Sequence, residues 1–167
     1  RTYQIDVSIP FVEFVFPTET SGTYLTRSNI LINATASAEV SISNLTIYLY
    51  NSTGLVNQTI VDSNQSYVNI TNLPNGIYIF NASARDSLNR IGWSETRNVT
   101  IDTINPLINF TAPTEISGTY ANKNFILVNV TSSDTNFKNL TIDIYDSSNS
   151  LENSFANLSS EFYLNYS

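Results

Sequence analysis

The sequence predicts an all-β protein made of tandem antiparallel β-sandwiches, with about 96 residues in each repeat. Three features indicate this fold class. The chain matches itself at a fixed offset, apolar and polar side chains alternate over short segments, and turn-forming residues separate these segments. No window of helical length has apolar residues at helical spacing, so we expect no long helix.

The self-match is the strongest of these features. Residues 1–36 and 97–132 are identical at 16 positions, all at an offset of 96. Residues 17–24 read PTETSGTY, and residues 113–120 read PTEISGTY. A repeat of this length is too long for a solenoid unit and has the size of a whole immunoglobulin-like sandwich.

Each expected strand has an apolar inner face and a polar outer face. In the first copy we expect Phe14 and Phe16 to point inward and Asn33 to point outward, so that Asn33→Ala costs little folding energy. In the second copy Phe110 points inward and Asn129 outward by the same alternation. The clearest alternating segments are 11–16, 30–35, 45–50, 77–85, 98–101, 107–112 and 126–131. Seven short strands in each repeat predict two antiparallel sheets packed face to face.

The phase of the repeat predicts where the domains begin and end. Residues 1–9 match the final strand and linker of a sandwich, so we expect them to belong to a preceding repeat. Residues 10–102 are expected to form one complete sandwich. Residues 103–167 are expected to form a second one, truncated before its last two strands. The chain has no methionine, not even at its start, which predicts a piece of a longer protein.

Leu73-Pro-Asn-Gly-Ile-Tyr78 predicts a tyrosine corner. In this motif a tyrosine near the start of the penultimate strand bonds the backbone a few residues upstream. The alternative is an ordinary core tyrosine with no such bond.

Composition excludes several functional classes. The formal net charge of −7 argues against nucleic acid or an anionic membrane as a partner. The chain has no histidine and no cysteine, which removes the Ser-His-Asp triad, cysteine nucleophiles, and zinc, haem or iron–sulfur ligation. No apolar run in the sequence approaches the ~18 residues of a membrane span, and we expect no signal peptide within these residues.

The join between the two copies resembles that of a known family. It reads Asp102-Thr-Ile-Asn-Pro106, then Ile108-Asn-Phe110, then Pro113 and Gly118. This order is similar to the linker, short strand and Pro-x-x-x-x-Gly turn of tandem immunoglobulin-like repeats, of the fibronectin-III and bacterial types, in prokaryotic and particularly archaeal cell-surface glycoproteins. The resemblance implies spacing, scaffolding or adhesion at a cell surface. The first linker, Asp6-Val-Ser-Ile-Pro10, departs from the pattern because it lacks the threonine.

Asn-x-Ser/Thr sequons are unusually dense. They predict N-glycosylation, with the turn sites Asn51, Asn57 and Asn64 the most accessible to a transferase. The alternative is that Asn and Ser/Thr simply share the polar face of a strand. Polar-face patterning does not explain why asparagine, a poor strand former, is used so often. The candidates are Asn33, Asn44, Asn51, Asn57, Asn64, Asn69, Asn81, Asn98, Asn109, Asn129, Asn139, Asn157 and Asn165.

Two further kinds of site are candidates. Trp93, Tyr48 and Tyr50 are expected on outer faces, where aromatic rings can stack on sugars; the alternative is packing against a neighbouring repeat or a glycan stem. Asp6 and Asp102 lie at the repeat joins, where oxygen ligands could hold Ca²⁺. Asp143 with Asp146, and Asp86 with Asn89, are weaker calcium candidates that are more simply explained as exposed turn residues. No cofactor is otherwise expected.

These patterns predict a structural segment of a cell-surface or extracellular glycoprotein, such as a surface layer, a stalk or a filament scaffold. Its expected partners are neighbouring repeats of the same parent chain or copies in an assembly, together with N-linked glycans. The alternative function is a glycan-binding or adhesion module, possibly accessory to a secreted enzyme. The chain itself is not expected to be an enzyme, because a repeat of 96 residues leaves no insertion that would form a cleft.

Overall fold

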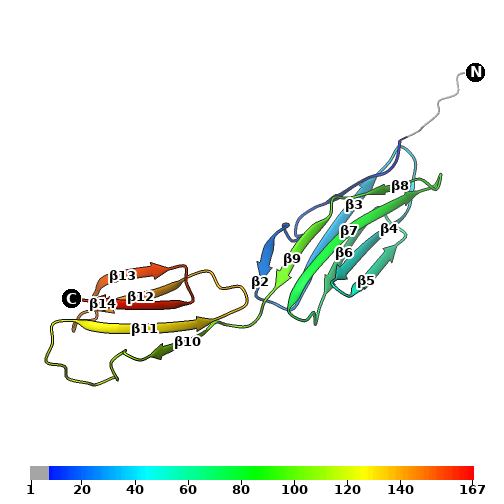
Figure 1. Ribbon diagram of the computed structural model, residues 1–167. Helices are drawn as coiled ribbons and strands as arrows, with labels where there is room; N and C mark the ends of the chain where they lie inside the picture. The colour runs from blue at the N-terminus through cyan, green and yellow to red at the C-terminus, as the bar shows by residue number, and fades with distance from the viewer. Residues whose placement is uncertain (1–7) are drawn as a thin grey trace, which may run out of the picture. The chain divides into compact units, whose positions relative to one another are not determined.

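The computed structural model describes residues 8–167, and Figure 1 shows the order of their strands. The chain divides into two compact units between Thr103 and Ile104. The predicted strand at 1–6 lies outside the described residues. No helix that could cross a membrane occurs within residues 8–167.

The first unit consists of two β-sheets. One has three strands in the order β1-β3-β6, and the other has β2-β9-β7-β4-β5 with β8 added alongside β7. The strands are β1 (Phe11–Phe14), β2 (Thr23–Leu25), β3 (Ile30–Ser37), β4 (Ile42–Asn51), β5 (Gly54–Val61), β6 (Gln65–Ile70), β7 (Gly76–Asp86), β8 (Ile91–Trp93) and β9 (Arg97–Ile101).

The inner faces of the two sheets form one apolar core. Ile30 and Ile32 of β3 are fully buried against Leu45, Ile47 and Phe80 of β4 and β7. These inward side chains alternate with side chains on the outer face along each strand, because successive residues of a strand point to opposite faces.

Two further contacts define the topology of this unit. β2 pairs in parallel with β9, while β4, β7 and β9 pair antiparallel. The Tyr78 hydroxyl donates to the Pro74 carbonyl at 2.9 Å, which confirms the predicted tyrosine corner at the start of β7. Two packed sheets that are antiparallel apart from the β2–β9 pair, together with this corner, make an immunoglobulin-like sandwich.

The prediction that Phe16 points inward was wrong, and Asn33, although it lies on the face of β3 opposite the core as predicted, is covered. Phe16 is 92% exposed, because β1 ends at Phe14 and the inward–outward alternation ends with it. Asn33 is only 8% exposed. The segment after β1 runs along β3, and the Asn33 side-chain amide donates to the Phe16 carbonyl at 2.9 Å.

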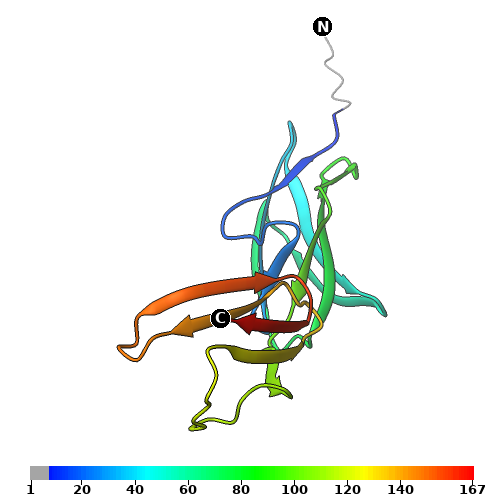
Figure 2. The same ribbon diagram turned by 60° about the vertical axis from the view of Figure 1, so that its left-hand side comes forward.

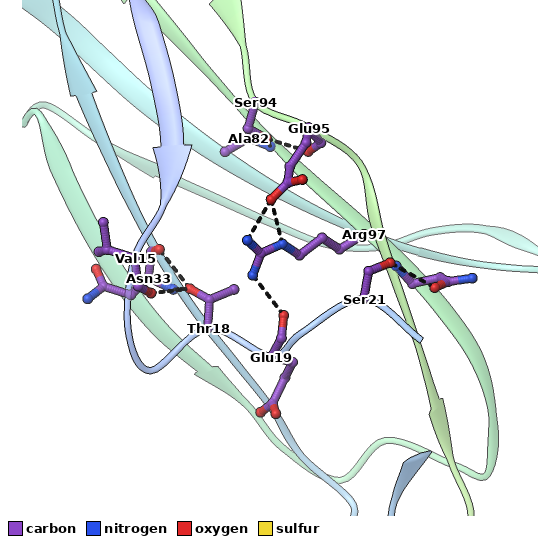
Figure 3. A network of polar contacts seen from close by, with 10 residues as sticks. Val15, Thr18, Glu19, Ser21, Asn33, Ala82, Ser94, Glu95 and Arg97 are labelled. Atoms are coloured by element: carbon purple, nitrogen blue, oxygen red, sulfur yellow. Dashed lines mark hydrogen bonds and ion pairs between the residues drawn. The ribbon is translucent and has the colours of Figure 1, made fainter. Parts of the chain in front are cut away.

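This segment is fixed by a network of polar contacts (Figure 3). The Thr18 hydroxyl donates to the carbonyl oxygens of Val15 and Asn33, each at 2.7 Å. Arg97 reaches the carboxylate of Glu95 and, at 3.0 Å, the carbonyl oxygen of Glu19. The start of β9 is therefore tied to the loop that follows β1.

The second unit has a three-stranded sheet, β10-β11-β14, and a separate hairpin, β12-β13. Figure 2 shows the hairpin lying over the sheet. Val128 and Val130 of β11 pack against Leu140 and Ile142 of β12. The strands are β10 (Leu107–Thr111), β11 (Ile126–Ser133), β12 (Leu140–Tyr145), β13 (Leu151–Asn157) and β14 (Glu161–Tyr166).

Phe110 lies on the inner face of this second unit, as predicted, but that face is open. Phe110 is 72% exposed, whereas its sequence match Phe14 is half-buried, with its ring 5.2 Å from that of Phe80. Phe80 belongs to β7, and the described part of the second unit has no counterpart of that strand. An apolar cavity of about 250 Å³, lined by Phe110, Val130 and Ile142 among others, lies there instead.

The segment that matches β2 in the repeat also lacks a partner strand within the described residues of the second unit. Residues 119–121 form no strand, and Tyr120 is fully exposed. In the first unit this segment gains its strand conformation by pairing with β9. Within residues 104–167 the structure describes no counterpart of β9 to provide that pairing.

Candidate functional site

The outer face of the larger sheet carries a groove whose shape follows from strand register. Thr46 of β4 pairs with Ile60 of β5 and Ser83 of β7, and Ser83 pairs with Trp93 of β8. The two central side chains of this row are small and buried, and the two outer ones are large. The result is a hollow of about 220 Å³, which we call the Trp93 groove.

The rings of Tyr48 and Trp93 form an aromatic wall of the Trp93 groove, and Tyr50 lies next to Tyr48 outside the lining. The rings of Tyr48 and Trp93 are stacked with centroids 5.6 Å apart, and those of Tyr48 and Tyr50 are stacked at 6.2 Å. Trp93 remains 56% exposed. The three residues named from the sequence as candidates for sugar stacking therefore lie together. Tyr48 and Tyr50 share the outer face of β4, and the ring of Trp93, on β8, reaches that of Tyr48 across the intervening strand β7.

Polar side chains complete the lining. Gln58 is the cross-strand neighbour of Tyr48, and Arg85 is the neighbour of Asn44. All four line the groove, which has no acidic residue in its lining. Sequence reasoning missed the roles of Arg85, Gln58 and Asn44 in a shared site. Arg85 could be placed on the outer face of its strand by alternation, but nothing in the sequence gives the register between strands.

The sequons differ in how their amide groups are used. Asn33 and Asn129 donate from Nδ2, the atom that carries an N-glycan, to the carbonyl oxygens of Phe16 and Ala112. These side chains hold the chain in place, and the folded protein does not offer their Nδ2 atoms to a transferase. Asn33 and Asn129 are therefore poor candidates despite their sequons.

Other sequons use the opposite atom. Asn51 and Asn98 accept hydrogen bonds through Oδ1, from Thr53 and from Ser21 respectively. This leaves Nδ2 directed to no described partner. Asn64 is exposed between β5 and β6, whereas Asn57 lies within β5 and not in a turn as expected. The same use of Oδ1 occurs at Asn57, Asn69 and Asn157.

Asp86 and Asp146 close turns. The Asp86 carboxylate accepts from the backbone N–H groups of Leu88 and Arg90 and pairs with the Arg90 side chain at 2.7 Å. Desolvation raises the pKa of Asp86, but the hydrogen bonds and charge of Arg90 and the bond from Leu88 outweigh it, so that this pKa lies below its ordinary value. Hydrogen bonds from Ser148 and Ser150 lower the pKa of Asp146 against a smaller desolvation effect.

At the repeat join, the side chain of Asn75 makes hydrogen bonds with two residues of the linker. Asn75 donates from Nδ2 to the Asp102 carboxylate at 3.2 Å and accepts from the Thr103 hydroxyl at 2.9 Å. Asp6 lies outside the described residues. No three acidic side chains within residues 8–167 lie close enough together to hold a metal ion. The oxygens named for calcium at Asp86, Asp102 and Asp146 thus have hydrogen-bonded roles in the fold.

Comparison with known proteins gives structural likenesses only. No family model matches the chain, and no curated protein matches it. Fibronectin(III)-like modules of CbhA from Clostridium thermocellum align over 92% of this chain and 78% of theirs, at 20% identity and a TM-score of 0.41. CopC from Methylosinus trichosporium aligns over 55% and 94%, at 17% identity and 0.41. The BSP domain of a biofilm-associated protein aligns over 89% and 23%, at 19% identity and 0.34. Likeness at this level defines no family or function for the chain.

Proposed function

We propose that this chain is a structural, non-catalytic segment of a cell-surface or extracellular glycoprotein, such as a surface layer, a stalk or a filament scaffold. In this proposal tandem immunoglobulin-like units act as spacers. Neighbouring repeats and copies of the parent protein are its partners, and N-linked glycans cover part of its surface.

The observation that carries the proposal is that the same hydrogen bonds from side chains to backbone carbonyl oxygens recur in both units. The Thr114 hydroxyl donates to the Asn129 carbonyl at 2.9 Å, as the Thr18 hydroxyl does to that of Asn33. Asn129 also donates to the carbonyl of Ala112, as Asn33 does to that of Phe16.

An ion pair also recurs at matching positions of the two repeats. Glu115 pairs with Lys123 in the second unit, and Glu19 pairs with Arg27 in the first. Each of these residues is separated from its match by 96 positions. Repetition of local contacts that have no part in any ligand site is what a tandem scaffold requires, since each unit has only to fold and connect.

Glycosylation and surface exposure supply the test. Glycopeptides from natively sourced protein should carry sugar at Asn51, Asn64, Asn69 or Asn98 and none at Asn33 or Asn129, which serve as controls within the molecule. Protease treatment of intact cells should release peptides of this chain. Unmodified asparagine at every sequon, together with protection of the chain in intact cells, would contradict the proposal.

A further inference from the structure

We propose that the Trp93 groove binds an acidic oligosaccharide. One sugar ring stacks on the exposed face of Trp93, and its carboxylate or sulfate group pairs with Arg85. The proposal concerns ligand binding and does not depend on the scaffold role.

The aromatic wall supports the sugar part of this ligand. Trp93 is the only tryptophan of the chain, and 56% of it is exposed although Tyr48 stacks beside it. An exposed ring of this size offers a flat apolar surface with a polar edge, which suits a ligand that is apolar on one face and hydroxylated at its rim. Ile60 on the opposite side of the groove extends the apolar surface.

The charge of the groove supports the acidic part. The whole chain has a formal net charge of −7, yet Arg85 is the single charged residue in the groove lining. Arg85 is half-buried and makes no ion pair with any other residue in the described range. A guanidinium group in the lining of the same groove as an aromatic wall is suited to a carboxylate or sulfate, which it can bind through two parallel N–H groups.

The remaining polar groups fit sugar hydroxyls. Amide groups of Asn44 and Gln58 lie at opposite ends of the groove, and the hydroxyls of Thr46 and Ser83 form its floor. Amides and hydroxyls both donate and accept hydrogen bonds, as the hydroxyls of a sugar require. Small-molecule sites typically combine such a few polar groups with an apolar wall.

The experiment uses the full chain produced without glycosylation, so that no sugar on its own Asn44 can occupy the groove. The probes are an array of uronate-containing, sialylated and sulfated oligosaccharides, each paired with a carboxyl-reduced or desulfated counterpart. We expect binding to acidic probes and at least about tenfold weaker binding to their neutral counterparts, the factor that loss of roughly 1.4 kcal/mol produces.

Variants assign the binding to the groove. Trp93→Ala and Arg85→Gln should each weaken the acidic probe about tenfold, while Trp93→Phe retains part of the affinity because a ring remains. Tyr67→Ala removes an exposed aromatic ring from β6, and Lys138→Gln makes the same charge change elsewhere. Both controls should leave binding within about twofold, which is roughly 0.4 kcal/mol.

Three results would overturn the proposal. These are no binding to any acidic probe, equal binding to acidic and neutral counterparts, or equal binding by the wild type and Trp93→Ala. Thermal unfolding of each variant, compared with the wild type, shows whether a loss of binding follows from a loss of fold.

Discussion

The hydroxyl of Tyr78 donates a hydrogen bond to the carbonyl oxygen of Pro74, four residues earlier and 2.9 Å away. The ring is buried at the start of β7, and burial raises the pKa of its hydroxyl. The bond connects the strand to the turn that precedes it. Asn75, in the same turn, holds Asp102 and Thr103 at the end of the unit.

Tyr78→Phe should lower the free energy of unfolding of the first unit by about 1 kcal/mol, the usual net contribution of one hydrogen bond. Urea unfolding followed by Trp93 fluorescence measures this, since Trp93 is the only tryptophan and lies in that unit. Tyr67→Phe is the control, because Tyr67 is exposed on β6. Equal stability of Tyr78→Phe and the wild type would show that the hydroxyl contributes nothing.

Asn33→Ala should destabilise the first unit by about 1–3 kcal/mol, because it leaves the Phe16 carbonyl without the amide that reaches it in the folded state. This reverses the expectation from strand alternation alone. Asn64→Ala, at an exposed turn, should change stability by less than about 0.5 kcal/mol. Chemical denaturation of the two variants compares them directly, and equal small effects would favour the original expectation.

Phe14→Ala and Phe110→Ala should have unequal effects although the two residues match in the repeat. Phe14 contacts the ring of Phe80, so its loss should cost the first unit about 3 kcal/mol. Phe110 is 72% exposed, so its loss should cost the second unit much less. Native-state hydrogen exchange reports each unit separately. Strong destabilisation by Phe110→Ala would mean that its ring is covered in solution.

Asp86 should make the first unit sensitive to acid. Its pKa is lowered in the folded state, so its contribution to stability is present above the unfolded value of about 3.9 and is lost as the pH falls through the folded value. Wild-type protein should therefore lose more stability than Asp86→Asn as the pH falls below about 4. Denaturation at each pH, monitored by Trp93 fluorescence, measures the difference.

Asp62→Asn is the matched control for the acid experiment. Asp62 is exposed in the turn between β5 and β6. Its replacement should leave the pH dependence of the wild type unchanged. The same slope of stability against pH in the wild type and in Asp86→Asn would refute the role given to Asp86.

Sequence reasoning was reliable where a feature depends on neighbours along the chain. Alternation placed Ile30, Ile32 and Phe80 in the core, and the spacing from Pro74 to Tyr78 predicted the corner. Both follow from strand geometry, in which successive side chains point to opposite faces. The sites named for aromatic stacking also lie on the outer face, for the same reason.

The amino-acid pattern alone was enough to predict the strand-rich architecture, the repeat of 96 residues and the faces of most strands. The folded structure was needed to learn that Asn33 is covered, that Phe110 is open to solvent and that Arg85 and Trp93 share a groove. Alternation says which face a residue takes, but not which residue lies opposite it on the next strand or what covers that face. Those relationships arise from strand register and from packing between distant segments, neither of which a local pattern contains.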